Sequence, residues 1–166
     1  MKVISKTAVA TLLAATLVFP ATSLFASGSH DSSHDEEFEA VMNDFGSYEP
    51  GMKPTKTIEI GMSDEMRFTP DVIKVKVGDV VMFKHENKGQ LGHEFVLGTA
   101  DSLDEHAEMM KKFPGMEHAE PYMAHVAAGE HGSIMWKFSE AGEFAFGCLV
   151  PGHYDSGMKG KVIVEL

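Results

Sequence analysis

The stretch Asp71-Val72-Ile73-Lys74-Val75-Lys76-Val77-Gly78-Asp79 decides the fold class. Hydrophobic and charged side chains alternate along it with a period of two, which predicts a β-strand with one face in a core and the other in water. The Gly-Asp pair at its end predicts a turn. Strands of this kind, repeated at short intervals, build all-β sandwiches.

Similar short runs lie on both sides of this stretch, with turn residues between them. From Thr55 onward, Ile58, Ile60 and Met62 alternate with polar residues or glycine. Further strands are predicted at 80–84, 94–97, 133–138, 142–146 and 161–165. This spacing favours a Greek-key β-sandwich that occupies residues 55–166.

One segment departs from the period of two. Residues 102–112 lack β-branched side chains, contain Ala, Glu, Met and Lys, and end before Pro114-Gly115. This composition predicts one short helix inserted between strands. The helix belongs to a longer insert, at about 100–127, that is rich in methionine and histidine.

Two segments precede the predicted sandwich. Two lysines, an apolar run over 8–19 and small residues up to Ala26 have the order of a secretory signal peptide. We therefore expect residues 1–26 to be cleaved and the protein to work in the periplasm. The apolar run is too short to span a bilayer, so no membrane insertion is expected after cleavage. Residues 27–54 are hydrophilic and acidic, which predicts a flexible arm.

The composition limits the classes of function. The 14 Lys and Arg against 25 Asp and Glu give a formal net charge of −11. Such a surface repels phosphate backbones and anionic lipid, which argues against nucleic acid and membranes as partners and favours basic proteins and metal cations. The 12 Met and 9 His accompany a single Cys. One cysteine excludes an internal disulfide, a Cys-x-x-Cys redox pair and a zinc site with two or more cysteines.

The single cysteine lies in a stretch of metal-binding residues. Cys148, His153 and Met158 are spaced as Cys-x4-His-x4-Met between two predicted strands, and His93 lies beside another strand upstream. Two His, one Cys and a weakly bound Met are the ligands of a trigonal copper site for electron transfer. Thiolate and thioether favour Cu(I), imidazole suits both oxidation states, and a loop fixed by its flanking strands limits reorganisation when an electron moves.

These residues resemble the metal site of the cupredoxins, the type 1 copper proteins that include plastocyanin, azurin and auracyanin. The resemblance covers about 55–166 and implies that His93, Cys148, His153 and Met158 hold one type 1 copper ion. The chain is also similar to the small periplasmic cupredoxins of bacterial copper tolerance, through Phe113-Pro114-Gly115-Met116 and Pro151-Gly152-His153-Tyr154. This similarity implies a role in copper tolerance or homeostasis.

The neighbours of the cysteine argue against two classes of copper enzyme. Multicopper oxidases have a His on both sides of this Cys and copper nitrite reductases have one adjacent His, whereas Gly147 and Leu149 are the neighbours here. Four protein ligands also leave no open position for a substrate. We therefore expect electron transfer through Cu(I)/Cu(II) cycling. A respiratory electron carrier and a cuprous oxidase with an external electron acceptor remain the alternatives. The expected redox partner is a basic c-type cytochrome or a copper efflux component.

The insert predicts an accessory copper site. Thioether and imidazole are ligands that select Cu(I), and several of both types lie close together in this part of the sequence. Two of the methionines fall on one helix face with a histidine, where they have an alternative role as core residues that fill gaps. The candidate ligands are His106, Met109, Met110, Met116, His118, Met123 and His125.

Four other residues are expected to have structural or surface positions and not to bind copper. Trp136 and Phe138 share one face of a predicted strand, so we expect them in the core. His85 and His131 lie next to predicted turns, and we expect both to be solvated. The sequence contains no phosphate-binding loop and no nucleophile elbow.

Overall fold

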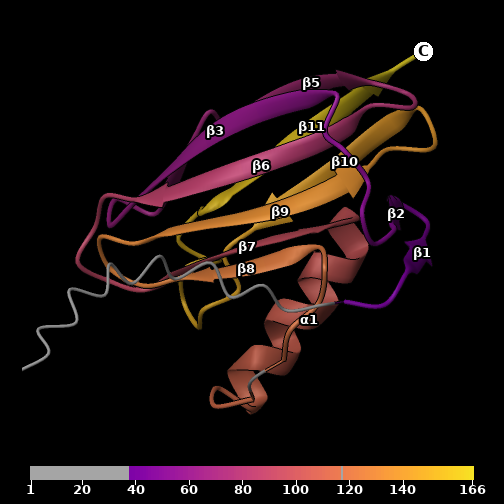
Figure 1. Ribbon diagram of the computed structural model, residues 1–166. Helices are drawn as coiled ribbons and strands as arrows, with labels where there is room; N and C mark the ends of the chain where they lie inside the picture. The colour runs from indigo at the N-terminus through magenta and orange to yellow at the C-terminus, as the bar shows by residue number, and fades with distance from the viewer. Residues whose placement is uncertain (1–37, 117) are drawn as a thin grey trace, which may run out of the picture. The chain divides into compact units, whose positions relative to one another are not determined.

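The computed structural model describes residues 38–116 and 118–166, which form two β-sheets and one helix (Figure 1). The first sheet has the order β1-β2-β9-β6-β3-β4. Its strands are β1 (Val41–Asn43), β2 (Gly46–Tyr48), β3 (Lys56–Ser63), β4 (Arg67–Thr69), β6 (Val80–Asn87) and β9 (His131–Lys137). The second sheet has the order β5-β11-β10-β7-β8. Its strands are β5 (Val72–Lys76), β7 (His93–Gly98), β8 (Met123–Val126), β10 (Gly142–Gly147) and β11 (Lys159–Glu165).

The alternating side chains meet between the two sheets. In β5, Ile73 and Val75 are buried while Lys74 and Lys76 are exposed, as the period of two predicts. The core is rich in aromatic rings that contact one another across the sheets, including Phe68, Phe83, Phe95, Phe138 and Phe146. The predicted all-β sandwich is confirmed, and Trp136 and Phe138 are fully buried as expected.

The helix α1 (Ala100–Lys112) is the predicted insert between strands. Thr99 caps its N-terminus: the Thr99 side chain accepts from the Ser102 amide, and the Ser102 side chain accepts from the Thr99 amide. The helix packs against β7 and β10 through a small second core (Figure 1). This core contains Val96, Leu103, Ala107, Met110, Met123, Leu149 and Tyr154. As a result β7 is covered on both faces, and all six of its residues are buried.

A hairpin precedes the predicted sandwich. Strands β1 and β2 pair with each other, and β2 pairs with β9. Phe45 at the turn is buried, its ring stacks on Trp136 with centroids 5.2 Å apart, and the Trp136 indole donates to the Phe45 carbonyl over 2.9 Å. The turn needs Gly46, because its φ is 132° and a Cβ atom at this position would clash with the Lys137 carbonyl.

The hairpin corrects part of the prediction for residues 27–54. The flexible arm expected there is instead a paired strand region over 41–48, because one buried aromatic residue and an indole hydrogen bond attach this polar segment to the sheet. Residues 27–37 and the predicted signal peptide at 1–26 lie outside the described residues. Within the described ranges, no helix is long and apolar enough to cross a membrane.

His85 also differs from its prediction. The strand β6 continues to Asn87, so His85 falls on the inward face with Val81 and Phe83 and is only 1% exposed. Its ring lies 4.4 Å from that of Phe95, and neither ring nitrogen has a hydrogen-bond partner among the described residues. Burial lowers the pKa of His85 to about 3, so the ring is neutral at pH 7. His131, by contrast, is exposed as predicted.

Candidate metal centre

The sequence-predicted ligands gather at one end of the second sheet. His93 is the first residue of β7, and Cys148 directly follows β10, which pairs with β7 in an antiparallel register that ends at Gly147 and Val96. This pairing places the two side chains at the same edge. His153 and Met158 lie in the loop that returns the chain from β10 to β11.

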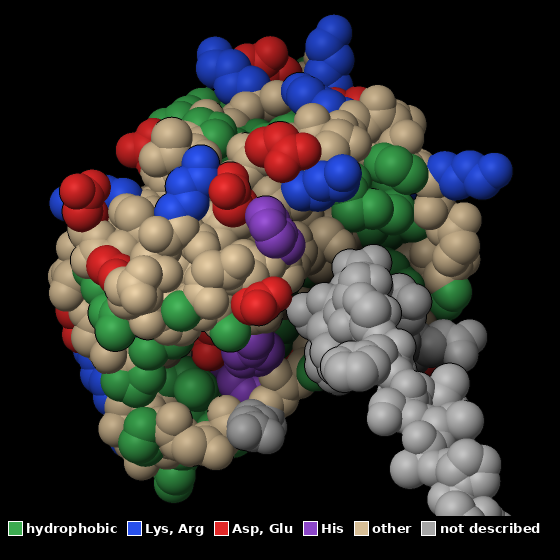
Figure 2. All heavy atoms as spheres, turned by 60° about the vertical axis from the view of Figure 1, so that its left-hand side comes forward, with side chains coloured by type: hydrophobic (Ala, Val, Ile, Leu, Met, Phe, Trp, Pro, Cys, Tyr) green, Lys and Arg blue, Asp and Glu red, His purple; other side chains and the backbone are tan. Residues whose placement is uncertain are grey.

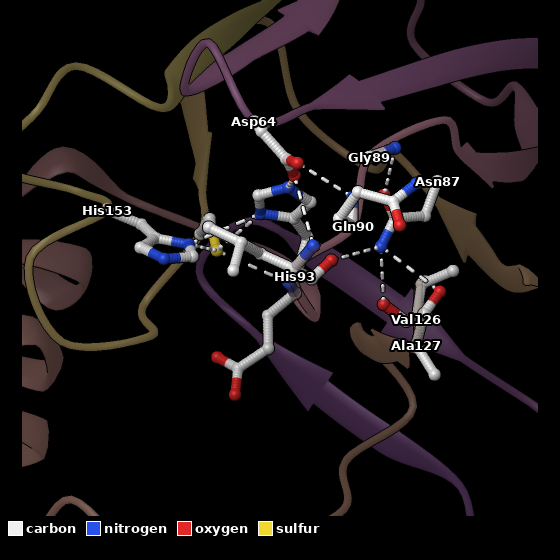
Figure 3. Close-up of polar contacts among 11 residues, drawn as sticks. Asp64, Asn87, Gly89, Gln90, His93, Val126, Ala127 and His153 are labelled. Atoms are coloured by element: carbon white, nitrogen blue, oxygen red, sulfur yellow. Dashed lines mark hydrogen bonds and ion pairs between the residues drawn. The ribbon is translucent and has the colours of Figure 1, made fainter. Parts of the chain in front are cut away.

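Three ligand atoms face one another across a small space. His93 Nδ1 lies 3.2 Å from His153 Nδ1. The Cys148 sulfur lies 3.3 Å from His153 Nδ1 and 4.0 Å from His93 Nδ1 (Figure 3). All three atoms lie within 4.8 Å of one another, which is the spacing of donors that share one ion.

The backbone joins Met158 to this group. The Cys148 amide donates to the Met158 carbonyl over 3.0 Å, and the Met158 amide donates to the His153 carbonyl over 3.1 Å. The Met158 side chain is fully buried in the same core as Cys148. These bonds close the loop on itself and bring its two ends together. We call His93, Cys148, His153 and Met158 the copper centre.

The protonation of the donors suits a soft or borderline cation. Burial raises the pKa of the Cys148 thiol to about 11, although the Glu94 amide donates to the sulfur over 3.3 Å and opposes this rise. A bound cation is therefore needed to keep the thiolate at pH 7. Burial, followed by the nearby His93, lowers the pKa of His153, which keeps this imidazole neutral and able to bind metal. One thiolate and two imidazoles with a nearby thioether fit copper.

Asp64 is a functional residue that the sequence did not reveal. His93 Nε2 donates to the Asp64 carboxylate over 3.3 Å, which leaves His93 Nδ1 with its lone pair directed at the other donors (Figure 3). The Gln90 amide that donates to this carboxylate over 2.7 Å holds the pKa of Asp64 below its usual value, and the Leu91 amide and His93 act in the same direction.

Asn87 fixes the other side of the loop before His93. It is 1% exposed, and its amide donates to the carbonyls of Leu91, Val126 and Ala127 over 2.8, 2.9 and 3.1 Å (Figure 3). Its side-chain oxygen accepts from the Gly89 amide over 2.9 Å. The loop over 88–92 is thus held from β6 by Asn87 and from the turn after β3 by Asp64. The first ligand therefore has a preformed position.

The sequence matches a known protein family. Residues 55–165 match the family model described as copper binding proteins, plastocyanin/azurin family. The chain belongs to the plastocyanin/azurin family of copper-binding proteins. Copper is therefore the cofactor of this family member, and the His-Cys-His group is where the structure can hold a metal.

Relatives and solved structures agree with the family. The copper-resistant cuproprotein CopI of Rubrivivax gelatinosus is 50% identical over 113 residues, which is 68% of each chain. The copper-resistant cuproprotein CopI of Vibrio cholerae is 31% identical over 159 residues, covering 89% of this chain and 94% of that one. Auracyanin B superposes with a TM-score of 0.59 at 22% identity, over 77% of this chain and 96% of that chain. At this identity the superposition supports the fold alone.

The structure separates the seven candidate ligands of the insert. Met110 and Met123 are buried in the small core under α1, the alternative role proposed for Met110. Met109 and Met116 line an apolar pocket of about 770 Å³ with Phe113 and Pro114, and they are 44% and 37% exposed. The three histidines instead lie near one another, with centroids 4.7 Å apart for His106 and His118 and 6.4 Å apart for His118 and His125.

Proposed function

We propose that this protein is a periplasmic type 1 copper protein that takes part in copper tolerance and transfers single electrons as its copper cycles between Cu(I) and Cu(II). The observation that carries this proposal is the set of three donor atoms within 4.8 Å on His93, Cys148 and His153. The relatives named copper-resistant cuproprotein CopI support the part in copper resistance. Bound copper would supply a one-electron redox centre.

The residues around the copper centre favour fast electron transfer. Asp64 orients His93, the Glu94 amide donates to the Cys148 sulfur, and backbone bonds close the ligand loop. A ligand set that is fixed before an electron arrives needs little rearrangement when the charge changes. The same fixed set leaves no position at which a substrate would displace a protein donor.

Electrons would enter and leave near His153. His93 is 2% exposed and Cys148 fully buried, whereas His153 is half-buried and follows two exposed residues of its loop, Pro151 and Gly152. The formal net charge of −11 would attract a basic partner from a distance. A basic c-type cytochrome or a component of a copper efflux system is the partner we propose.

The optical spectrum of the copper-loaded protein tests the type 1 centre. The wild type should show an intense absorption from thiolate-to-copper charge transfer, and Cys148→Ser should lose this absorption completely. Colourless wild-type protein with Cu(II) bound would contradict the proposal. Circular dichroism of both proteins controls for folding.

The cellular role has a separate test. A strain that lacks this gene should be sensitive to copper, and the wild-type gene, but not Cys148→Ser, should restore growth. Mature protein from the periplasmic fraction should begin after the predicted signal peptide. Normal copper tolerance with impaired respiration would favour the respiratory carrier. Oxidation of excess Cu(I) by catalytic amounts of protein with an added electron acceptor would favour the cuprous oxidase.

A further inference from the structure

A second group of donor side chains lies beside the copper centre. The ring of His118, in the loop after α1, lies near the rings of His106 on α1 and His125 on β8, and His125 contacts the carboxylate of Glu94 on β7. Figure 2 shows histidine side chains at two separate places on this face of the molecule, the lower group being the larger. We call Glu94, His106, His118 and His125 the insert cluster.

Backbone carbonyls orient two of these imidazoles. His125 Nε2 lies 3.0 Å from the His118 carbonyl, and His118 Nδ1 lies 3.4 Å from the Met116 carbonyl. A carbonyl only accepts, so each of these nitrogens donates its hydrogen outward. The opposite nitrogens, His118 Nε2 and His125 Nδ1, then lie on the sides of the rings that face away from these carbonyls, and His125 Nδ1 faces the Glu94 carboxylate. Metal-binding histidines have this arrangement, and His93 has it at the copper centre, where its outward nitrogen donates to Asp64.

Two buried polar atoms of the cluster lack partners. Among the residues that the structure describes, neither His118 Nε2 nor Glu94 Oε2 has a hydrogen-bond partner. Glu94 is 7% exposed, and its other oxygen lies 3.1 Å from His125 Nδ1. A buried carboxylate oxygen and a buried ring nitrogen left without partners destabilise the folded chain. A cation bound in the cluster would give such an atom a partner.

The spacing of the rings suits a shared ion. Imidazole nitrogens bind Zn(II) or Cu(II) at about 2 Å, which places the ring centroids of two ligands on one ion roughly 4.5–6.5 Å apart. The insert cluster has centroid distances of 4.7 and 6.4 Å. At the copper centre, the corresponding distance between His93 and His153 is 5.1 Å.

We infer that Glu94, His106, His118 and His125 form a second metal site, which binds a divalent ion of the Cu(II) or Zn(II) class. Three imidazoles and one carboxylate suit these ions, in contrast to the Cu(I) site that the methionine content of the insert predicted. His106 is suited to this role because burial, followed by the nearby His118, lowers its pKa and keeps its ring neutral. Only the choice of copper over zinc rests on the proposed function.

Residue 94 joins the second site to the copper centre. Glu94 follows the ligand His93, its amide donates to the Cys148 sulfur over 3.3 Å, and its side chain faces His125. The ligands of the two sites, His93 and Glu94, would therefore be consecutive residues of β7. The positive charge of a cation at the insert cluster would favour the lower oxidation state at the copper centre, so occupancy of the second site should raise the reduction potential there.

Copper stoichiometry of the full mature protein tests the inference. The wild type should bind two Cu(II) per chain, and Cys148→Ser should keep one, which gives the electron paramagnetic resonance signal of copper with nitrogen and oxygen ligands. In the Cys148→Ser background, Glu94→Gln and His118→Asn should each weaken Cu(II) binding at least about tenfold in isothermal titration. His131→Asn, which changes an exposed histidine outside the cluster, is the matched control and should bind as before.

The outcomes separate this inference from the proposed function. Second-site binding in a protein whose wild type lacks the thiolate absorption would contradict the type 1 proposal alone. The inference is overturned if Cys148→Ser binds no Cu(II), or if it binds Cu(II) equally well after the Glu94 and His118 substitutions. His118→Asn lies in a loop and should fold normally, so it tests the site even if the buried Glu94→Gln change unfolds the chain.

Discussion

The copper centre and the insert cluster are adjacent, yet they are held in different ways. The donors of the copper centre come from strand ends and one closed loop of the sandwich, and Cys148 and Met158 are fully buried. The insert cluster takes its histidines from a helix, a loop and the edge strand β8, where His125 is exposed. A rigid, enclosed centre suits electron transfer without ligand motion. An open cluster suits a metal that binds and leaves.

The largest effect we predict is a loss of stability in acid. It should affect both regions, because both depend on β7, which packs against the neutral ring of His85. The pKa of His85 is about 3 in the folded protein, against 6.5 for an ordinary histidine. Below pH 6.5 the unfolded chain binds a proton that the folded chain does not, so the free energy of unfolding falls as the pH decreases toward 3. At pH 5 we expect a loss of about 2 kcal/mol relative to pH 7.

Urea unfolding of the metal-free protein at pH 7 and pH 5 measures this loss. His85→Leu removes the titrating ring at similar volume, so the variant should lose about 2 kcal/mol less than the wild type between the two pH values. Equal losses in both proteins would show that His85 does not control acid stability. Metal-free protein is needed because protons also compete with copper for imidazole nitrogens.

Two glycines test how tightly the copper centre is packed. Gly147 precedes Cys148, and an added Cβ would lie 2.6 Å from a ring carbon of Tyr154, the neighbour of His153. Gly147→Ala should displace that ring, cost about 1–3 kcal/mol of stability and shift the thiolate-to-copper absorption. Gly92, which precedes His93, has no atom within 4 Å of its own added Cβ.

The matched variant Gly92→Ala should therefore leave both stability and spectrum unchanged. Thermal unfolding and absorption spectra of the two variants make the measurement. Copper binding at the insert cluster should stay within about twofold of the wild type in both, because its donors lie outside this loop. Identical effects of the two substitutions would mean that packing around Tyr154 does not hold the ligand loop.

The sequence predicted those elements and ligands whose pattern lies within one short stretch of the chain. Period-two alternation identified β3 and β5, each of which buries one face in a shared core, and further short runs with turn residues between them identified β6, β7, β9, β10 and β11. Three of the four predicted copper ligands lie within one loop, so their spacing alone indicated a site, and the structure brings His93 to Cys148 and His153. The composition of residues 102–112 likewise identified α1, whose cap begins a few residues earlier at Thr99.

The rest depended on contacts between distant segments. Alternation places Glu94 on the outer face of β7, but α1 covers that face and buries the carboxylate. Asp64 lies in an ordinary turn, and only the folded chain brings it to His93. His85 looked like a strand-end residue because Glu86 and Asn87 suggested a turn, whereas pairing with β9 and β3 extends β6 through them. Phe45 packs against Trp136, which lies 91 positions away in the sequence, so no local pattern indicated this contact.

The smallest effect we predict is on the reduction potential of the copper centre. It distinguishes the influence of one nearby carboxylate from that of the net charge of the surface. The Asp64 carboxylate accepts from His93 Nε2, so its negative charge favours the higher oxidation state of a metal bound at His93 Nδ1. Asp64→Asn keeps an acceptor for the Gln90 amide but removes the charge. The reduction potential should rise by about a few tens of millivolts in protein-film voltammetry at pH 7.

Asp79→Asn is the control for this change. Asp79 precedes β6, at the opposite end of that strand from Asn87, and its carboxylate accepts from the Lys76 amide. Both substitutions change the net charge equally, but salt screens the distant one. Equal shifts would show that net charge alone sets the potential. A shift only in Asp64→Asn would show that the Asp64–His93 contact sets the potential. This contact has the same place at the copper centre as the carbonyls that orient His118 and His125 have in the insert cluster.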